Sequence, residues 1–157
     1  MARAHLTRRA ALALLAGATV AACSSGGNSD EATATSDPDA GIREQVAGQE
    51  WSLVALYDAV IAAQPALAGE LAALRQQHVD HANALGSASA PPASASPPAV
   101  PSSPEAARAT LLDAEAAAVR ERTQACQAAV GTEPARLLAL IAASEAGHAA
   151  YLRGAAT

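Results

Sequence analysis

Eighteen residues made almost entirely of Ser, Ala and Pro, at positions 86–103, divide the C-terminal part of this 157-residue chain. Such a composition does not form a packed element, and long helical patterns lie on both sides of it. A Pro-rich segment extends about 3.1 Å per residue, so this one reaches roughly 55 Å. A 20-residue helix is only about 30 Å long. The segment is therefore long enough to cross a whole helical bundle; a spacer between adjacent hairpins is the alternative.

The composition of the chain argues against an all-β domain. Hydrophobic residues make up 51% of the sequence but aromatic residues only 2%, with no Phe. Much of the apolar content is Ala, which is the best helix former and a poor strand residue. We expect an all-α fold.

Apolar periodicity predicts four helices, over roughly 39–64, 66–85, 104–130 and 132–153. Pro65, Gly86 and Gly131 mark their ends, and Ser103 followed by Pro104 is typical of a helix start. The two short turns predict two antiparallel hairpins. If residues 86–103 cross the bundle, the third helix runs parallel to the second and beside it.

The first 22 residues have the pattern of a signal peptide. Arg3, Arg8 and Arg9 precede an apolar stretch of thirteen residues, 10–22. About 20 apolar residues are needed to span a bilayer, so this stretch is too short for a transmembrane helix. We expect residues 1–22 to be removed during export.

The end of this segment, Val20-Ala21-Ala22-Cys23, resembles the lipobox of bacterial lipoproteins. The resemblance implies that Cys23 is acylated and becomes the mature N-terminus, which anchors the exported protein to the outer face of the cytoplasmic membrane, in the cell envelope. An incidental Cys after an ordinary signal peptide is the alternative. Because Thr7-Arg8-Arg9-Ala10-Ala11-Leu12 also looks like a weak twin-arginine signal, both export routes stay open.

Residues 23–38 are rich in Ser, Thr, Gly, Asp and Ala and predict a flexible acidic tether before the bundle at 39–157. Without residues 1–22 the chain has 7 Arg and 15 acidic residues, a net charge of −8. This charge excludes a nucleic-acid-binding surface and leaves membrane attachment to the acyl chains. Cys126 then has no second Cys for an intramolecular disulfide.

Polar residues occupy inward positions of all four predicted helices. They are Glu50, His78, His81, Glu115, Glu145 and His148. Unpaired carboxylates are costly in a core, so these residues need partners.

Counting from the turns predicts that these side chains lie at one height in the bundle. In the first hairpin Glu50 is 15 residues before Pro65, and the two His residues are 13 and 16 after it. In the second hairpin Glu115 is 16 residues before Gly131, and the Glu–His pair is 14 and 17 after it. With the crossover in place, all six side chains converge on one layer.

The residue order resembles the dimetal pattern of ferritin-like four-helix bundles, which is Glu, Glu-x-x-His, Glu, Glu-x-x-His with a long crossover after the second helix. Leu74-Arg75-Gln76-Gln77-His78-Val79-Asp80-His81 and Ala143-Ser144-Glu145-Ala146-Gly147-His148 look more specifically like a ferritin-like domain of exported bacterial proteins. The resemblance implies that the six residues form a metal site and covers roughly residues 40–153.

His78 departs from this pattern, because it stands where a bridging Glu is expected. Two ferrous ions carry four positive charges, whereas Glu50, Glu115 and Glu145 supply three negative ones. Three Glu and three His suit a single Fe²⁺, Zn²⁺ or Mn²⁺ better than a bridged pair.

A metal-free layer is the second hypothesis. Arg122 lies two turns after Glu115 on the same face and could pair with it, which would make the layer a salt-bridge network. The protein would then be a non-catalytic helical module that acts through a protein partner on its acidic surface. Tyr57, two turns from Glu50, could approach the layer in either case. The sequence identifies no catalytic residue or substrate, and it fits a monomer or a dimer.

Overall fold

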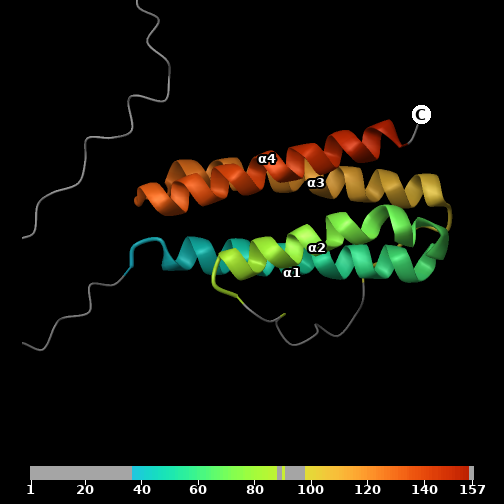
Figure 1. Cartoon of the computed structure of the whole chain (residues 1–157), viewed down its shortest axis with the longest axis horizontal. Coiled ribbons are helices and arrows are strands. Elements are labelled where there is room, and N and C mark those ends of the chain that lie inside the picture. Colours follow the sequence, from blue (N-terminus) through green and yellow to red (C-terminus); the bar gives the residue numbers. More distant parts are fainter. Residues whose placement is uncertain (1–36, 88–89, 91–97, 156–157) are drawn as a thin grey trace, which may run out of the picture. The chain divides into compact units, whose positions relative to one another are not determined.

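A computed structural model of the chain describes residues 37–87, 90 and 98–155, which all belong to the unit Ser36–Thr157. Within these residues the fold is entirely helical (Figure 1). Its elements are α1 (Ala40–Ala63), the short 3₁₀ helix η1 (Pro65–Leu67), α2 (Ala68–Ala84), α3 (Pro104–Ala128) and α4 (Thr132–Gly154). The four predicted helices are confirmed, with ends that differ by no more than two residues. The predicted signal peptide, Cys23 and most of the tether lie outside the described residues.

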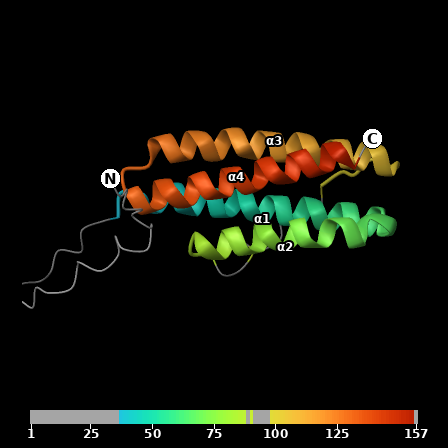
Figure 2. The same cartoon turned by 45° about the horizontal axis from the view of Figure 1, so that its top comes forward.

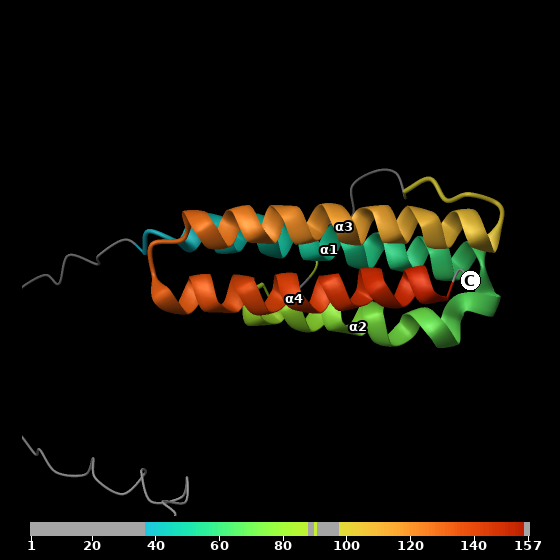
Figure 3. The same ribbon diagram turned by 90° about the horizontal axis from the view of Figure 1, so that it is seen from above.

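The helices form two antiparallel hairpins, α1–α2 and α3–α4 (Figure 1). The second hairpin lies on the first so that α3 packs against α1 and α4 lies beside α2 (Figure 3). Helices α2 and α3 run in the same direction, as expected, but the expectation that they are neighbours is wrong (Figure 2). They occupy opposite corners of the bundle (Figure 2), since α3 packs against α4 and α1.

The connection between α2 and α3 starts and ends at different heights of the bundle. Near its start, the indole N–H of Trp51 donates to Ser87 Oγ at 3.1 Å. Near its end, the side-chain amide of Gln64 donates to the carbonyls of Pro101 and Ser102, at 3.4 and 2.9 Å. Trp51 and Gln64 are thirteen residues apart on or just after α1, about 20 Å along its axis. The two described ends of the connection therefore lie at different heights of the bundle, and a connection that starts and ends at the same end of the bundle is excluded.

Local sequence explains where α2 ends and α3 begins. The Ser103 side chain accepts a hydrogen bond from the Ala106 N–H at 3.2 Å, and Pro104 is the first residue of α3. Gly86, just after α2, has φ +94°, a conformation that residues with a side chain rarely adopt. Both predicted boundaries are confirmed.

The turn between α3 and α4 is tied to the start of α1 by Asp39. This buried carboxylate accepts hydrogen bonds from the N–H groups of Val130, at 2.9 Å, and Gly131, at 2.7 Å. A Cβ atom on Gly131 would lie 3.0 Å from Asp39 Oδ2. A side chain at this position would require the Asp39 carboxylate and Pro134 to shift, whereas the φ of −82° is open to other residues.

The apolar core consists of two clusters. One contains Tyr57, Val60, Leu67, Leu71, Leu74, Ala107, Leu111 and Leu152. The other contains Val46, Ala47, Leu85, Leu138 and Ile141. Polar side chains fill the space between the two clusters.

No single helix among the described residues is long and apolar enough to cross a membrane; α1 taken together with the bent segment Pro65–Ala84 passes the test of length and composition.

Candidate metal centre

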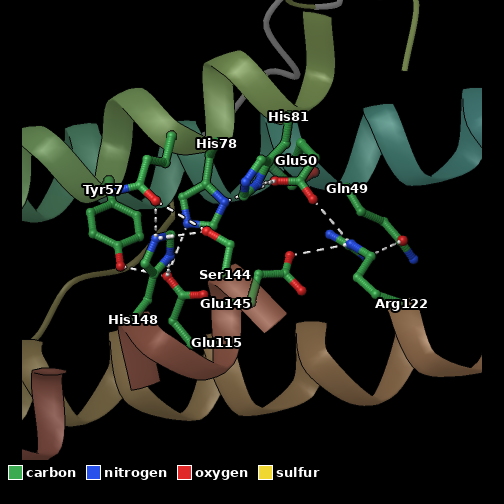
Figure 4. A network of polar contacts seen from close by, with 12 residues as sticks. Gln49, Glu50, Tyr57, His78, His81, Glu115, Arg122, Ser144, Glu145 and His148 are labelled. Atoms are coloured by element: carbon green, nitrogen blue, oxygen red, sulfur yellow. Dashed lines mark hydrogen bonds and ion pairs between the residues drawn. The ribbon is translucent and has the colours of Figure 1, made fainter. Parts of the chain in front are cut away.

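Eight side chains form a polar layer across the middle of the bundle (Figure 4). All four helices contribute two residues each to this layer, which consists of Glu50, Tyr57, His78, His81, Glu115, Arg122, Glu145 and His148. Every residue except His81 is buried. The six residues predicted from the sequence are thus brought together, as the count from the turns indicated.

His78 connects two of the carboxylates. Its Nδ1 donates to Glu50 Oε2 at 2.8 Å and its Nε2 donates to Glu115 Oε1 at 2.9 Å. Burial lowers the pKa of His78, but the hydrogen bonds and the charges of Glu115 and Glu50 outweigh it and raise the pKa to about 9. At neutral pH His78 is therefore an imidazolium that donates from both nitrogens.

Glu115 receives contacts from three helices on a single oxygen. Oε1 accepts from the Tyr57 hydroxyl at 2.5 Å and from His78, and His148 Nδ1 lies 3.3 Å away. Oε2 is buried and has no hydrogen-bond partner among the described residues. Burial raises the pKa of Glu115, but the contacts with His148, His78 and Tyr57 outweigh it and lower the pKa to about 2. Burial and, next, the charge of Glu115 raise the pKa of Tyr57. Its hydroxyl group therefore stays protonated and donates to Glu115.

Arg122 pairs with residues other than the one expected from the sequence. Its Nε lies 3.0 Å from Glu50 Oε1 and 3.2 Å from Glu145 Oε1, and its Nη1 donates to Gln49 Oε1 at 2.6 Å. The expected pair with Glu115 is wrong, because seven residues of helix displace Arg122 by about 10 Å along the axis of α3. The fully buried guanidinium therefore lies beside Glu50 and Glu145, where its positive charge compensates the charge of Glu50.

The two carboxylates beside Arg122 have opposite protonation. Burial raises the pKa of Glu50, but the contacts with His78 and His81 and the charge of Arg122 outweigh it and hold the pKa well below its ordinary value. Burial also raises the pKa of Glu145. The charge of Arg122 lowers this pKa and the charge of Glu50 raises it further, so that it reaches about 9. Glu50 is thus ionised at neutral pH, whereas Glu145 is a neutral carboxylic acid.

Two groups of three side chains in this layer could hold a metal ion. One is Glu50, His78 and His81, and the other is His78, Glu115 and His148; in each group the ligand atoms lie within 4.8 Å of one another. Both groups include His78, and its two ring nitrogens face different groups. Glu145, which the sequence also placed among the ligands, belongs to neither group and contacts Arg122.

Three residues of the site escaped the sequence analysis. Gln49 accepts from Arg122, while Gln77 Oε1 lies 3.0 Å from His148 Nε2 and accepts from the Ser144 hydroxyl at 3.0 Å. Gln77 and Ser144 each lie beside a predicted ligand on the outer edge of a helical stripe, where a polar residue is read as solvent-facing. Their role depends on which helices are neighbours.

No family model, curated protein or solved structure matches this chain.

Proposed function

We propose that this is an exported, lipid-anchored, ferritin-like protein that binds one divalent metal ion through His78, Glu115 and His148. These ligands come from α2, α3 and α4, so the ion would hold three helices together. Two imidazoles and one carboxylate suit Fe²⁺, Zn²⁺ and Mn²⁺, and they leave coordination positions open for water.

The arrangement around His148 is the observation that carries the proposal. Gln77 Oε1 is 3.0 Å from Nε2; in the tautomer whose Nε2–H donates to this oxygen, Nδ1 is left as the ligand atom. Nδ1 then faces the Glu115 carboxylate at 3.3 Å, and a cation between these two atoms, a proton or in its place a metal ion, would satisfy both. Metal-binding His residues are commonly oriented by such a hydrogen bond from the second ring nitrogen. The unpartnered Glu115 Oε2 offers a further donor.

The group formed by Glu50, His78 and His81 is less suited to the ion. Glu50 already has a permanent cation at 3.0 Å, the guanidinium of Arg122, whereas Glu115 contacts no Arg among the residues that the structure describes. His81 is also partly exposed, with 15% of its side chain accessible. Because His78 faces the two groups with different nitrogens, a neutral His78 serves only one ion.

The ferritin-like part of the proposal is supported by the order of the layer residues along the chain and by the directions of the helices. One Glu, an i, i+3 pair, one Glu and a second i, i+3 pair come from four successive helices. The long connection joins two helices that run in the same direction (Figure 1). Both features are those of the ferritin-like bundles that the sequence resembles.

Thermal melting of the purified protein tests metal binding. An ion that binds only the folded state at a hundredfold excess over Kd stabilises it by about 2.7 kcal/mol. For a bundle of this size the melting temperature should rise by roughly 10 °C over that in chelator. His148→Ala should abolish the shift produced by Zn²⁺, Fe²⁺ or Mn²⁺, whereas His81→Ala, the same change on the other group, should retain it.

The outcomes separate the two groups from each other and from a metal-free layer. A shift lost in His81→Ala but kept in His148→Ala would move the ion to the group with Glu50. No shift in the wild type with any of the three ions would contradict metal binding.

A non-catalytic binding or scaffold module is the second candidate function, and one observation favours it. Without an ion the layer already contains two positive and two negative charges, on His78, Arg122, Glu50 and Glu115. A layer that is balanced in this way needs no ion to stay folded. Under this alternative, added metal leaves the melting temperature unchanged and the layer only stabilises the fold.

The lipid anchor is proposed from the sequence alone, because Cys23 lies outside the described residues. Cells that express the protein should incorporate labelled palmitate into it, and Cys23→Ala should remove the label and leave an unprocessed precursor. Cys126→Ala is the matched control, because this half-buried thiol belongs to the bundle and should keep the label. Label retained in Cys23→Ala would contradict the anchor.

A further inference from the structure

Three side-chain oxygens surround the guanidinium of Arg122 at the centre of the bundle. They are Gln49 Oε1 at 2.6 Å, Glu50 Oε1 at 3.0 Å and Glu145 Oε1 at 3.2 Å. We call the space between these three oxygens the oxygen-lined position. Two of the oxygens belong to carboxylates, so a cation is held here by hard oxygen donors from α1 and α4. Oxygen donors of this kind also bind Mn²⁺ and similar divalent ions.

Arg122 satisfies this position only in part. Glu145 is fully buried, and neither of its oxygens has a hydrogen-bond partner among the described residues. The Nη2 atom of Arg122 is likewise buried without a partner in the same part of the chain. A single positive charge with fixed N–H directions thus leaves the Glu145 carboxyl group without a hydrogen bond, although Arg122 Nε lies 3.2 Å from its Oε1. A spherical divalent ion at the same point could approach all three oxygens.

The position also lies next to solvent. A surface groove of about 260 Å³ runs between α1 and α3, and its wall includes Gln49, Glu121 and Arg122. Glu121 Oε2 lies 3.5 Å from Arg122 Nη1, and half of the Glu121 side chain is exposed. An ion could therefore reach the oxygen-lined position from this groove once the arginine side chain is removed.

We infer that Arg122 is a built-in cation: it fills a second metal position, the oxygen-lined one, and so limits the layer to one metal ion. Once a divalent ion is bound and Glu145 has lost the proton that it retains in the metal-free layer, three carboxylates, one Arg and one divalent ion sum to zero. A second divalent ion beside Arg122 would leave an excess of two positive charges in a buried layer. The inference rests on the proposed function for the ion at His148, but the oxygen-lined position stands without it.

Manganese binding to Arg122 variants tests this inference. Free Mn²⁺ is measured by electron paramagnetic resonance during titration of the purified full chain, and bound Mn²⁺ is measured by elemental analysis after desalting. Arg122→Met, which has a similar length and no charge, should bind one Mn²⁺ per chain more than the wild type. Arg122→Lys keeps a cation in the position and should bind the same number as the wild type.

A double variant assigns the additional ion. Arg122→Met combined with Glu145→Gln should bind the same number of ions as the wild type, because the carboxylate that Arg122 leaves without a hydrogen bond is then gone. Equal Mn²⁺ binding by the wild type and Arg122→Met would overturn the inference. So would an additional ion that persists in the double variant.

Failure of the proposed function gives a different result. If the wild type binds no ion and Arg122→Met binds one, the site at His148 is absent and the built-in cation is confirmed. Removal of Arg122 also leaves buried acids without a cation, so the variant is compared by circular dichroism with chelator and with Mn²⁺. Folding that requires Mn²⁺ supports the inference. A chain unfolded in both conditions overturns it, because an ion that fitted the position would restore the charge balance.

Discussion

At the residue scale, the imidazole at position 78 decides the chemistry of the layer. A Glu at this point would face Glu50 and Glu115 and would require metal ions to hold three acids together. His78 instead donates to both, from two ring nitrogens. The layer can therefore be folded and neutral without an ion, and an ion bound at the proposed site would have to displace the proton on Nε2 of His78.

The Tyr57 hydroxyl also donates a hydrogen bond to Glu115, which His78 already contacts. Tyr57→Phe removes the hydrogen bond to Glu115 and changes little else, so we expect a loss of about 1.5–3 kcal/mol in the free energy of unfolding. Urea denaturation in chelator measures this loss. Tyr151→Phe, the same change at a half-exposed site, should stay within about 0.5 kcal/mol of the wild type. Equal effects of the two variants would show that the buried hydrogen bond contributes nothing.

At the scale of the elements, each hairpin is held by its own short turn, and separate contacts join the two hairpins. Asp39 is one of these contacts, because it precedes α1 and binds the turn between α3 and α4. A second contact is the ion pair between Glu70 of α2 and Arg108 of α3, with Nη2–Oε2 at 2.7 Å. The contact of buried Asp39 should stabilise the packing of the two hairpins more than the Glu70–Arg108 pair does, since partly exposed ion pairs contribute little to stability.

Asp39→Ala should therefore weaken the docking of the turn. Two backbone N–H groups lose their acceptor, and leaving such donors unsatisfied costs roughly 1–3 kcal/mol. Hydrogen exchange measured by NMR should become faster at the amides of Val130 and Gly131. Asp113→Ala, on the exposed face of α3, is the control and should change neither stability nor these exchange rates. Unchanged protection of both amides in Asp39→Ala would contradict this role.

At the scale of the whole molecule, the buried charges set the pH at which the bundle is most stable. The pKa values of Glu50 and Glu115 lie below the ordinary 4.5, so their contribution is present above pH 4.5 and is lost as the pH falls. The pKa of His78 rises from 6.5 to about 9, so its contribution is complete below pH 6.5 and is lost as the pH rises through 9. The raised pKa of Glu145 likewise makes stability fall between pH 4.5 and 9.

We expect maximal stability in chelator between about pH 4.5 and 6.5, the ordinary pKa values of Glu and His, and a steady decline toward pH 9. Urea denaturation at a series of pH values measures the profile. Glu145→Gln removes the proton that the folded state retains, so the decline should become shallower and stability at pH 8 should increase. A maximum at alkaline pH, or the same slope in Glu145→Gln, would contradict these charge assignments.

Much of the fold and of the site could be predicted from the sequence because helices have a fixed rise and period. Helical periodicity places Leu67, Leu71, Leu74 and His78 on one face of a helix, and all four residues are buried. Counting residues from the two turns placed Glu50 and the pairs of α2 and α4 at one height, which the structure confirms. The length of 86–103 predicted the common direction of α2 and α3.

The sequence by itself therefore determined the helices, their ends, the order of the hairpins and the residues of the polar layer. Each of these depends on distances along the chain. Tertiary structure alone decided that α3 packs against α1, that Arg122 binds Glu50 instead of Glu115, and that Gln77 orients His148. Those contacts join elements far apart in sequence. They depend on how each helix is rotated about its axis and on which helices are neighbours, and many weak packing contacts together set both.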